Sequence, residues 1–395
     1  MLRKLIPIVA LVAMTIVPFS NSQASSPAPN IKRVFVYVLE NTSYDQVVGN
    51  KQAPYLNSLI KRFTLATNYT ATGHASTDNY IAMTSGQRPN PATMGDCMFY
   101  ATPLCIQNVP NIGDQMEAAH LSWKGYMDSM ARPCMHTKEN SQEKSQNAYA
   151  PRHNPFMYYR DIVDNQERCD AHVVPMTQFW KDQASGAVPD YSFITPDTCH
   201  DGHDSGKPCK EGGGIHEADR FSARTIPKIL GDPSWKDGGL LILTFDEGGV
   251  AGDDALAVAT DNVDFGGHVY TLLAYPNSVP GRTLTQPFDH YALLKTVEDL
   301  FCLSYIGNAA LPTTGSMLTA IGQRRCSRTA ANATTPALAA APASVAVGAA
   351  AAAPLGEHEL AATGPARART VALGLALAFL GLATLVMTGR RNSDL

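Results

Sequence analysis

The folded part of the chain alternates between short, almost wholly apolar runs and longer segments with helical spacing. The runs Arg33–Leu39 (RVFVYVL) and Gly238–Phe245 (GGLLILTF) are rich in Val, Leu and Ile, which is typical of parallel strands buried on both faces. Helical spacing is found in Ala53–Phe63, Ile215–Leu230 and His290–Phe301. Further strands are expected at Ser122–Met127, Asp190–Thr195 and His268–Pro276. The alternation predicts an α/β domain with a mostly parallel sheet.

The N-terminal end of the chain departs from this pattern. Arg3 and Lys4 precede an apolar run over residues 5–19, and Ser22–Ala24 (SQA) suits cleavage by signal peptidase. We therefore interpret residues 1–24 as a secretory signal peptide. The alternative is an N-terminal membrane anchor, although the apolar run is shorter than the ~20 residues that a membrane span needs.

The C-terminal end carries a short motif, an apolar segment and a basic tail, in that order. Leu360–Gly364 (LAATG) precedes the apolar segment 371–387, and Arg390 and Arg391 lie in the tail 388–395. This order is similar to a Gram-positive sortase sorting signal of the LAxTG type. The resemblance implies a transmembrane segment, a cytoplasmic basic tail, sortase as a partner and a protein held at the cell wall. The alternative is a plain C-terminal membrane anchor.

Composition separates a linker from the folded unit. Residues 327–359 are dominated by Ala and Pro and carry little charge, so they are expected to form a linker without a core. Residues 31–326 remain as one catalytic domain of roughly 300 residues. The net charge of −4 offers no basic surface of the kind that nucleic acid requires, so no nucleic-acid partner is expected.

The cysteines indicate disulfides. All eight lie between Cys97 and Cys326, in a chain that is expected to be exported. Pairing cannot be deduced from the sequence alone; the simplest arrangement is Cys97–Cys105, Cys134–Cys169, Cys199–Cys209 and Cys302–Cys326. A cysteine-rich metal site is the alternative, and the absence of a CxxC pair argues against it.

Acidic and amide side chains directly follow the two most apolar strands. Glu40 and Asn41 follow the first strand, and Asp246 and Glu247 follow the second. In open α/β sheets, ligands bind outside the carboxyl ends of the strands. Carboxylates gathered there repel one another unless a cation or protons intervene, and oxygen ligands suit a divalent cation. Taken singly, each pair is also typical of a turn.

A second group of candidate ligands lies in Pro196–Asp204 (PDTCHDGHD). This segment contains Asp201 and His203, and His268 is the first residue of the apolar strand expected at His268–Pro276. Histidine together with aspartate suits zinc or a similar metal. These residues are expected to bind a second metal ion, with Asp201 and His268 as ligands, or to protonate a leaving group, with His203 as the acid. A single histidine is more often a hydrogen-bonded structural residue.

The segment Gly73–Gly86 (GHASTDNYIAMTSG) raises the question of a nucleophile. Ser76, Thr77, Asp78 and Asn79 stand where a polar turn gives way to a short apolar helix. Such residues are common helix N-caps. The alternative is that a hydroxyl serves as a nucleophile where free backbone N–H groups can hold an anion.

Several motifs, taken in order, resemble the bacterial phosphoesterase family of acid phosphatases and phospholipases C, in the alkaline phosphatase superfamily. They are ENTSYDQVVG, GHASTDNYIAMTSG, HNPFMYY, PDTCHDGHD and LLILTFDEGG. The resemblance covers most of residues 31–310. It implies an α/β/α sandwich and a metal ion held by Glu40, Asn41, Asp246 and Glu247. The identity of the metal stays open among Zn, Mn, Mg and Ca.

The resemblance also implies site roles. Ser76 falls on the nucleophile, with Thr77 in reserve, and Asn79 falls on the amide that binds phosphate. Asp78 departs from the pattern, because related sequences usually have Pro there. His153 and Asn154 of the HNPFMYY motif are expected to line the substrate pocket.

Together these features predict an exported, surface-anchored and metal-dependent phosphoesterase. The reading favoured is a phosphomonoesterase that resembles acid phosphatases and works through a phosphoserine. The alternative is a phosphodiesterase similar to phospholipase C. A third reading is a non-catalytic surface binding protein with a phosphatase-like fold. A sulfatase is disfavoured because the chain lacks a C/S-x-P-x-R segment.

Overall fold

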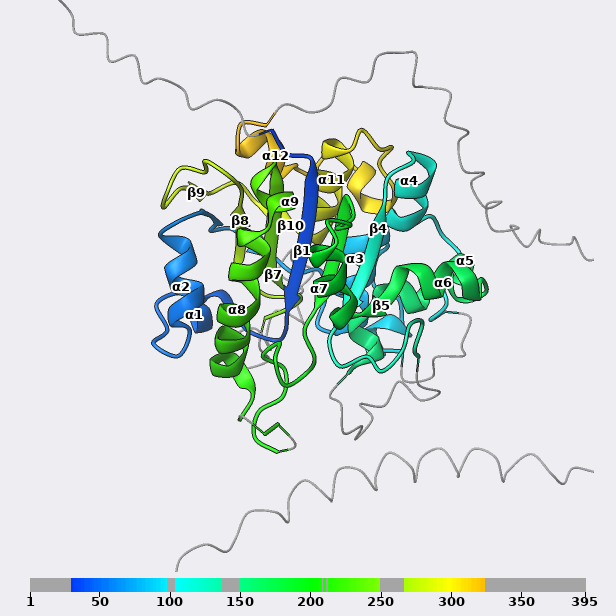
Figure 1. The fold of residues 1–395 in the computed structure, drawn as a ribbon, viewed down its shortest axis with the longest axis horizontal. Coiled ribbons are helices and arrows are strands. Elements are labelled where there is room, and N and C mark those ends of the chain that lie inside the picture. Colours follow the sequence, from blue (N-terminus) through cyan, green and yellow to red (C-terminus); the bar gives the residue numbers. More distant parts are fainter. Residues whose placement is uncertain are drawn as a thin grey trace, which may run out of the picture. The chain divides into compact units, whose positions relative to one another are not determined.

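A computed structural model describes residues 30–97, 104–136, 149–207, 209–210, 212–248 and 266–323. These residues form one large, mostly parallel sheet with helices packed around it (Figure 1). Helix α2 packs against α8, and α3 packs against α11. The predicted α/β class with a mostly parallel central sheet is confirmed.

The large sheet has eight strands, and the chain's first strand lies near its centre. In spatial order they are β5 (Val173–Pro175), β4 (Trp123–Met127), β6 (Tyr191–Thr195), β1 (Arg33–Leu39), β7 (Gly239–Phe245), β8 (Thr271–Ala274), β2 (Thr64–Ala66) and β9 (Thr283–Leu284). Neighbours from β5 to β7 are parallel, and β8 runs antiparallel to both β7 and β2. A second sheet pairs β3 (Tyr69–Thr70) with β10 (Phe288–Asp289).

The helices connect these strands and cover the sheet. The α-helices are α1 (Tyr44–Val47), α2 (Pro54–Ile60), α3 (Ser76–Ser85), α4 (Ile112–Ala118), α5 (Arg160–Val163), α6 (Gln166–His172), α7 (Met176–Ala184), α8 (Gly214–Gly231), α9 (Pro233–Lys236), α11 (His290–Leu300) and α12 (Met317–Ala320). The 3₁₀ helices are η1 (Thr93–Gly95), η2 (Pro151–His153), η3 (Pro155–Tyr158) and η4 (Gly307–Ala310).

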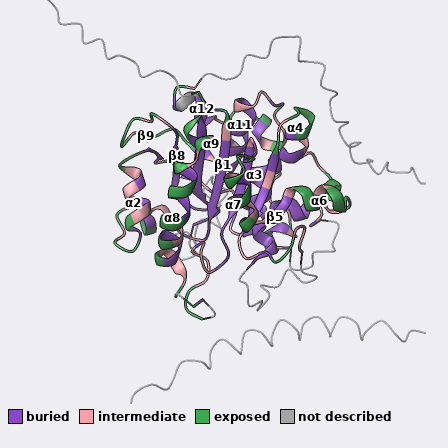
Figure 2. Cartoon of the chain, viewed as in Figure 1, coloured by how far each residue is buried: buried purple, intermediate pink, exposed green. Residues whose placement is uncertain are grey.

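The centre of the sheet is the core of the protein. All seven residues of β7 are buried, as are six of the seven in β1. Figure 2 shows the strands at the centre of the sheet in the colour of buried residues. Leu39 pairs with Phe245 across the parallel β1–β7 ladder, so the residues that follow these strands emerge side by side. This register positions the acidic groups of the site.

Most long predicted elements occur within a residue or two of their expected bounds. The exceptions have local causes. The predicted helix Ala53–Phe63 ends at Ile60, because the chain must turn before β2 begins at Thr64. The predicted strand His268–Pro276 is shorter in the structure, where β8 covers Thr271–Ala274.

Three of the four expected disulfides are present. Cys97–Cys105, Cys134–Cys169 and Cys199–Cys209 are bonded, which confirms these pairings. The fourth expected pair includes Cys326, which lies outside the described residues.

The predicted terminal segments also lie outside the described residues. They are the signal peptide 1–24, the linker 327–359, the sorting motif 360–364, the membrane segment 371–387 and the tail 388–395. Within the part of the chain that the structure describes, no helix is both long enough and apolar enough to span a bilayer.

Candidate active site

The carboxyl ends of β1 and β7 bring two acidic pairs together. The Asn41 backbone N–H donates to Asp246 Oδ1 at 3.1 Å, and the Glu247 N–H donates to the same oxygen at 2.7 Å. Asn41 has a φ of 46°, in the left-handed region. Glu40, Asp246 and Glu247 are all buried. The structure therefore places these four predicted residues at one junction.

This junction contains buried oxygens without a hydrogen-bond donor among the residues that the structure describes. They are Asn41 Oδ1, Asp246 Oδ2 and Glu247 Oε2. The His74 ring lies nearby, with Nδ1 3.6 Å from Glu247 Oε2. An unpaired buried polar group costs about 1–3 kcal/mol, and more when it is charged. A set of unsatisfied carboxylate and amide oxygens of this kind fits a divalent cation.

Burial and mutual repulsion raise the pKa values of the carboxyl groups at this junction. Burial raises the pKa of Glu40 well above its usual range, and the nearby Asp246 and Asp201 charges raise it further. Burial likewise raises the pKa of Glu247, with Asp246 adding to the rise. A bound cation would reverse this effect, because it favours the ionised forms.

Ser76 lies at the start of α3 and contacts the acidic cluster, by which we mean Glu40, Asp246 and Glu247. Its Oγ donates to Glu40 Oε2 at 3.1 Å, and the Tyr80 hydroxyl donates to Glu40 Oε1 at 2.6 Å. All ten residues of α3 are buried. The N-cap position is Ala75, which makes no side-chain cap, so Ser76 is not the capping residue. Its hydroxyl is turned to the acidic cluster instead.

Asn79 organises the loop before the helix. Its Oδ1 accepts from the backbone N–H groups of Thr72 and Gly73, at 2.9 and 3.1 Å. Its Nδ2 donates to the backbone oxygens of Gly73 and Ala75, at 2.7 and 3.2 Å. The amide expected to bind phosphate is therefore engaged with the loop, and a direct bond to substrate would require one of these bonds to open.

Asp78 is buried at the same helix start. Among the described residues, its carboxylate oxygens have no hydrogen-bond partner. Burial, together with the Asp96 and Asp246 charges, raises its pKa to about 8. Asp78 lies against Gly73, where a Cβ atom would be 2.5 Å from its Oδ1. A glycine at 73 therefore makes room for the carboxyl group that replaces the usual Pro.

His153 bridges two of the buried acids. Its Nε2 lies 3.4 Å from Glu40 Oε2, and its Nδ1 lies 3.2 Å from Asp201 Oδ2. Ligand atoms of these three residues lie within 4.8 Å of one another, so they form a second group that suits a metal ion. Asn154, which follows His153, is buried and donates to the Tyr149 hydroxyl at 2.9 Å.

His203 lies beside this group and contacts Arg152, a residue that none of the sequence motifs includes. Arg152 Nη2 and His203 Nε2 are 3.0 Å apart, and His203 Nδ1 lies 2.8 Å from Asp204 Oδ1. Arg152 directly precedes the HNPFMYY motif. Its position next to that motif was an available signal, but its burial depends on the packing of η2 and could not be read from the sequence.

His268 is placed differently from the other predicted ligands. It is exposed, and its ring stacks on Tyr44 with centroids 4.1 Å apart. The antiparallel β7–β8 register puts the start of β8 next to the end of β7, so His268 lies near this edge of the sheet. The structure does not group it with the other candidate ligands.

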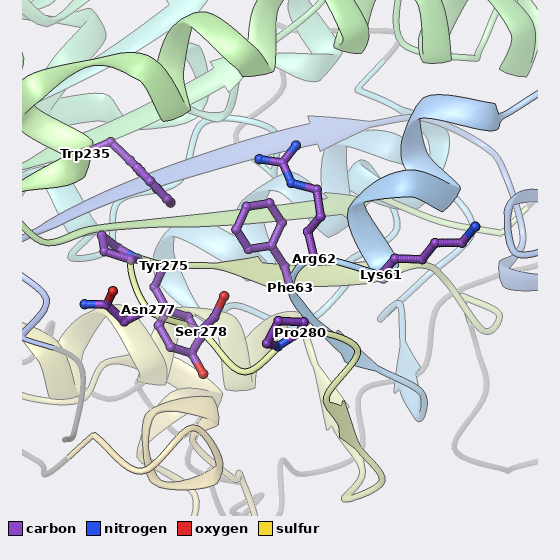
Figure 3. A pocket seen from close by; sticks show the side chains of 9 residues that line it. Lys61, Arg62, Phe63, Trp235, Tyr275, Asn277, Ser278 and Pro280 are labelled. Atoms are coloured by element: carbon purple, nitrogen blue, oxygen red, sulfur yellow. The ribbon is translucent and has the colours of Figure 1, made fainter. Parts of the chain in front are cut away.

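A separate hollow of about 520 Å³ lies at the opposite end of the strands, near the start of β7 and the end of β8 (Figure 3). Its lining includes Lys61, Arg62, Phe63, Trp235, Tyr275 and Asn277. None of these residues belongs to the acidic cluster, so the cluster is the candidate for chemistry.

The comparisons with known proteins agree with this geometry. Residues 50–304 match the Phosphoesterase family. The chain belongs to the phosphoesterase family. This membership confirms the resemblance drawn from the motifs.

Several curated relatives in the family carry phosphatase names. A probable acid phosphatase from Kluyveromyces lactis is 28% identical over 277 residues, covering 70% of this chain and 59% of that protein. A phosphate-repressible acid phosphatase from Penicillium chrysogenum is 27% identical, covering 71% of this chain and 63% of that protein. The chain thus spans less than two thirds of these fungal relatives. A phosphatidylinositol-3-phosphatase from Mycobacterium tuberculosis is 26% identical, covering 72% of this chain and 82% of that protein.

Solved structures support the fold. A protein in the alkaline phosphatase superfamily from Vibrio parahaemolyticus superposes with a TM-score of 0.50 at 12% identity. The match covers 74% of this chain and 70% of that chain.

Proposed function

We propose that this protein is an exported, surface-anchored and metal-dependent phosphomonoesterase that works through a phosphoserine at Ser76. One observation carries the proposal: Ser76 Oγ is hydrogen-bonded to Glu40 at 3.1 Å, beside the unsatisfied oxygens of Asn41, Asp246 and Glu247. A hydroxyl nucleophile beside oxygen atoms that could bind a divalent cation suits phosphoryl transfer. This reaction depends on positioning of the reactants and on electrostatic stabilisation.

The chain's residues have separate parts in the proposed reaction. Ser76 Oγ attacks phosphorus, so an Oγ–P bond forms and the ester P–O bond breaks. Water takes up the Ser76 hydroxyl proton and returns a proton to the leaving oxygen, which departs as an alcohol. Glu40 accepts the Ser76 hydrogen bond and holds Oγ toward the cluster. Water then hydrolyses the phosphoserine and releases phosphate. A divalent cation bound by Glu40, Asn41, Asp246 and Glu247 would neutralise charge on the phosphoryl oxygens and favour the ionised serine.

The relatives favour a monoester as substrate. Those described above are named acid phosphatase or phosphatidylinositol-3-phosphatase, and phosphomonoesters are the common substrate class of these names. A phospholipase C-like phosphodiesterase needs the same nucleophile and stays the alternative. A non-catalytic binding protein is less well supported. Buried, unpaired acidic groups lower the stability of the fold, and a protein that binds its partner elsewhere on its surface has no need of them.

Export and surface anchoring rest on the sequence. The three described disulfides are consistent with an oxidising compartment. The predicted signal peptide and the predicted LAATG sorting motif support a protein held on the outer face of a Gram-positive cell, with sortase as the anchoring partner.

The proposal is tested by turnover with and without a chelator. Wild-type protein is assayed on 4-nitrophenyl phosphate and on 4-nitrophenyl phosphorylcholine. We expect hydrolysis of the monoester, with loss of activity after thorough chelation and recovery on adding a divalent cation. Asp246→Ala should lower turnover by about 100-fold or more, because a ligand is removed. Asp237→Ala is the matched control, since this exposed residue pairs with Lys32 far from the cluster.

Each component of the proposal has an outcome against it. Preferential hydrolysis of the phosphorylcholine diester would support the phosphodiesterase. Undiminished turnover after chelation would exclude the metal. Failure to hydrolyse either ester, with a folded protein and metal present, would support the binding protein.

A further inference from the structure

Arg152 is a buried cation beside the acidic cluster. It lies in η2, and only 4% of its surface is exposed. Within the described part of the chain, its guanidinium makes no hydrogen bond to a carboxylate. The nearest carboxylate oxygen is Asp96 Oδ2, 4.0 Å from Nε, which is beyond hydrogen-bonding distance. A buried arginine is normally paired, so this arrangement leaves donors available for an anion.

The hydrogen bond that Arg152 makes within the described residues also fixes its orientation. A guanidinium can only donate, so Arg152 Nη2 must donate to His203 Nε2, at 3.0 Å. His203 then carries its proton on Nδ1 and donates to Asp204 Oδ1, at 2.8 Å. The chain Asp204–His203–Arg152 therefore holds the guanidinium in one position.

Two short routes connect Arg152 to the nucleophile. Along the first, the adjoining residue His153 lies 3.4 Å from Glu40 Oε2, the oxygen that accepts from Ser76. Along the second, Asp96 accepts from the Thr77 backbone N–H through Oδ1 at 3.0 Å and faces Arg152 through Oδ2. Arg152 thus stands at the start of α3, where Ser76 lies.

We propose that Arg152, oriented by His203 and Asp204, binds nonbridging oxygens of the substrate phosphoryl group and makes the site prefer a phosphomonoester to a phosphodiester. This inference rests on the proposed function. A monoester presents a dianionic phosphoryl group with three free oxygens, whereas a diester presents one negative charge and two free oxygens. A planar guanidinium fork matches two such oxygens at once, and its attraction grows with their charge. His203 acts here as a positioning residue, not as the acid for the leaving group.

The experiment compares two esters with the same leaving group. 4-Nitrophenyl phosphate is the monoester and methyl 4-nitrophenyl phosphate is the diester. Arg152→Gln should lower kcat/KM for the monoester by about 100-fold or more, as does the loss of a donor to a charged transition state, while the diester rate falls less than about tenfold. The inhibition constant of inorganic phosphate should rise in parallel. Arg160→Gln is the matched control, because Arg160 is exposed and pairs with Asp164.

Further variants separate charge, geometry and positioning. Arg152→Lys keeps the positive charge but lacks the planar guanidinium, so it should retain more monoester selectivity than Arg152→Gln. It also replaces Arg152→Gln in the test if that variant does not fold. His203→Leu removes the acceptor of Arg152 and should reproduce the selective loss. His203→Gln, which retains an acceptor, should keep more monoester turnover than His203→Leu. Metal content and Tm are measured for every variant.

The outcomes distinguish this inference from the proposed function. Equal losses on both esters in folded, metal-loaded Arg152 variants would overturn it, as would an unchanged inhibition constant for phosphate. No turnover of either ester by the wild type would overturn the proposed function itself.

Discussion

At Ser76, a single hydroxyl is held between a helix start and a buried carboxylate. The hydroxyl donates to Glu40, and the N-cap position belongs to Ala75. Its location therefore contributes little to helix capping. The consequence is that removing this hydroxyl should separate activity from stability.

Ser76→Ala should lower turnover of 4-nitrophenyl phosphate by orders of magnitude while the free energy of unfolding falls by only about 1 kcal/mol, the value of one hydrogen bond. Turnover is followed by released nitrophenol, and stability by denaturant unfolding. In the wild type, quenching the reaction in acid should trap a phosphopeptide that covers residues 73–86, with the phosphate on Ser76.

Thr77→Ala is the matched variant for this prediction. Thr77 is the next residue of α3 and is equally buried. If phosphate is trapped on Thr77, the nucleophile is the neighbour of the predicted residue. If Ser76→Ala keeps full turnover and no phosphopeptide is trapped, direct attack by water replaces the covalent mechanism.

The positions of some site residues could be predicted from the sequence, and those of others could not. Glu40 and Asp246 follow parallel strands that share a register, so their proximity could be predicted once both strands were recognised. Asn79 was recognised, but its engagement with the preceding loop depends on a local turn that the motif does not specify. Arg152 lies in η2 and Asp96 directly follows η1, and only tertiary packing brings them to α3.

Among the elements, the loop that follows β6 is firmly held at several points. The Cys199–Cys209 disulfide closes it, and His200 Nδ1 lies 2.9 Å from Asp128 Oδ2 and 3.0 Å from Asp197 Oδ1. At Gly202, with a φ of 109°, an added Cβ would be 2.9 Å from the Glu40 backbone oxygen. This loop carries Asp201 and His203, so its anchoring positions part of the site.

The His200 ion pair should make this anchoring depend on pH. Burial opposes the charge of His200, but hydrogen bonds to Asp128 and Asp197 raise its pKa to about 10. A histidine has an unfolded pKa of ~6.5, so the stabilisation is complete below that pH and is lost as the pH rises to about 10. His200→Gln should therefore cost about 1–3 kcal/mol of unfolding free energy at pH 6, and much less at pH 10.

The measurement is denaturant unfolding of wild type and variant at pH 6, 8 and 10 with disulfides intact. Asp128→Asn is the control, because it removes one partner and should reduce the pH dependence. A difference between wild type and His200→Gln that is the same at all three pH values would contradict the prediction.

The predictability of elements followed their length and burial. The seven-residue strands β1 and β7 have continuous apolar runs and were predicted from them. Strands β2 and β9 have three and two residues, which is too short for a periodic signal. Their pairing in the sheet is decided by neighbouring strands, and no local pattern records it.

For the whole molecule, the predicted sorting motif can be tested on cells. If sortase cleaves LAATG, wall digests should contain a peptide that ends at Thr363, covalently bound to wall material. Mass spectrometry detects this C-terminus, and Leu360→Ala should abolish it. Recovery of the wild type by detergent with the tail Arg390–Leu395 intact would instead indicate a membrane anchor.

The strand order also has a consequence for how the chain is made. Strand β1 ends at Leu39, yet its partners β6 and β7 end at Thr195 and Phe245. At a synthesis rate of about 5–20 residues per second, β7 is completed about 10–40 seconds after β1. Throughout this interval its apolar run lacks its native neighbours and can associate wrongly with other chains. We therefore expect the nascent protein to depend on a holding chaperone more strongly than the finished one does.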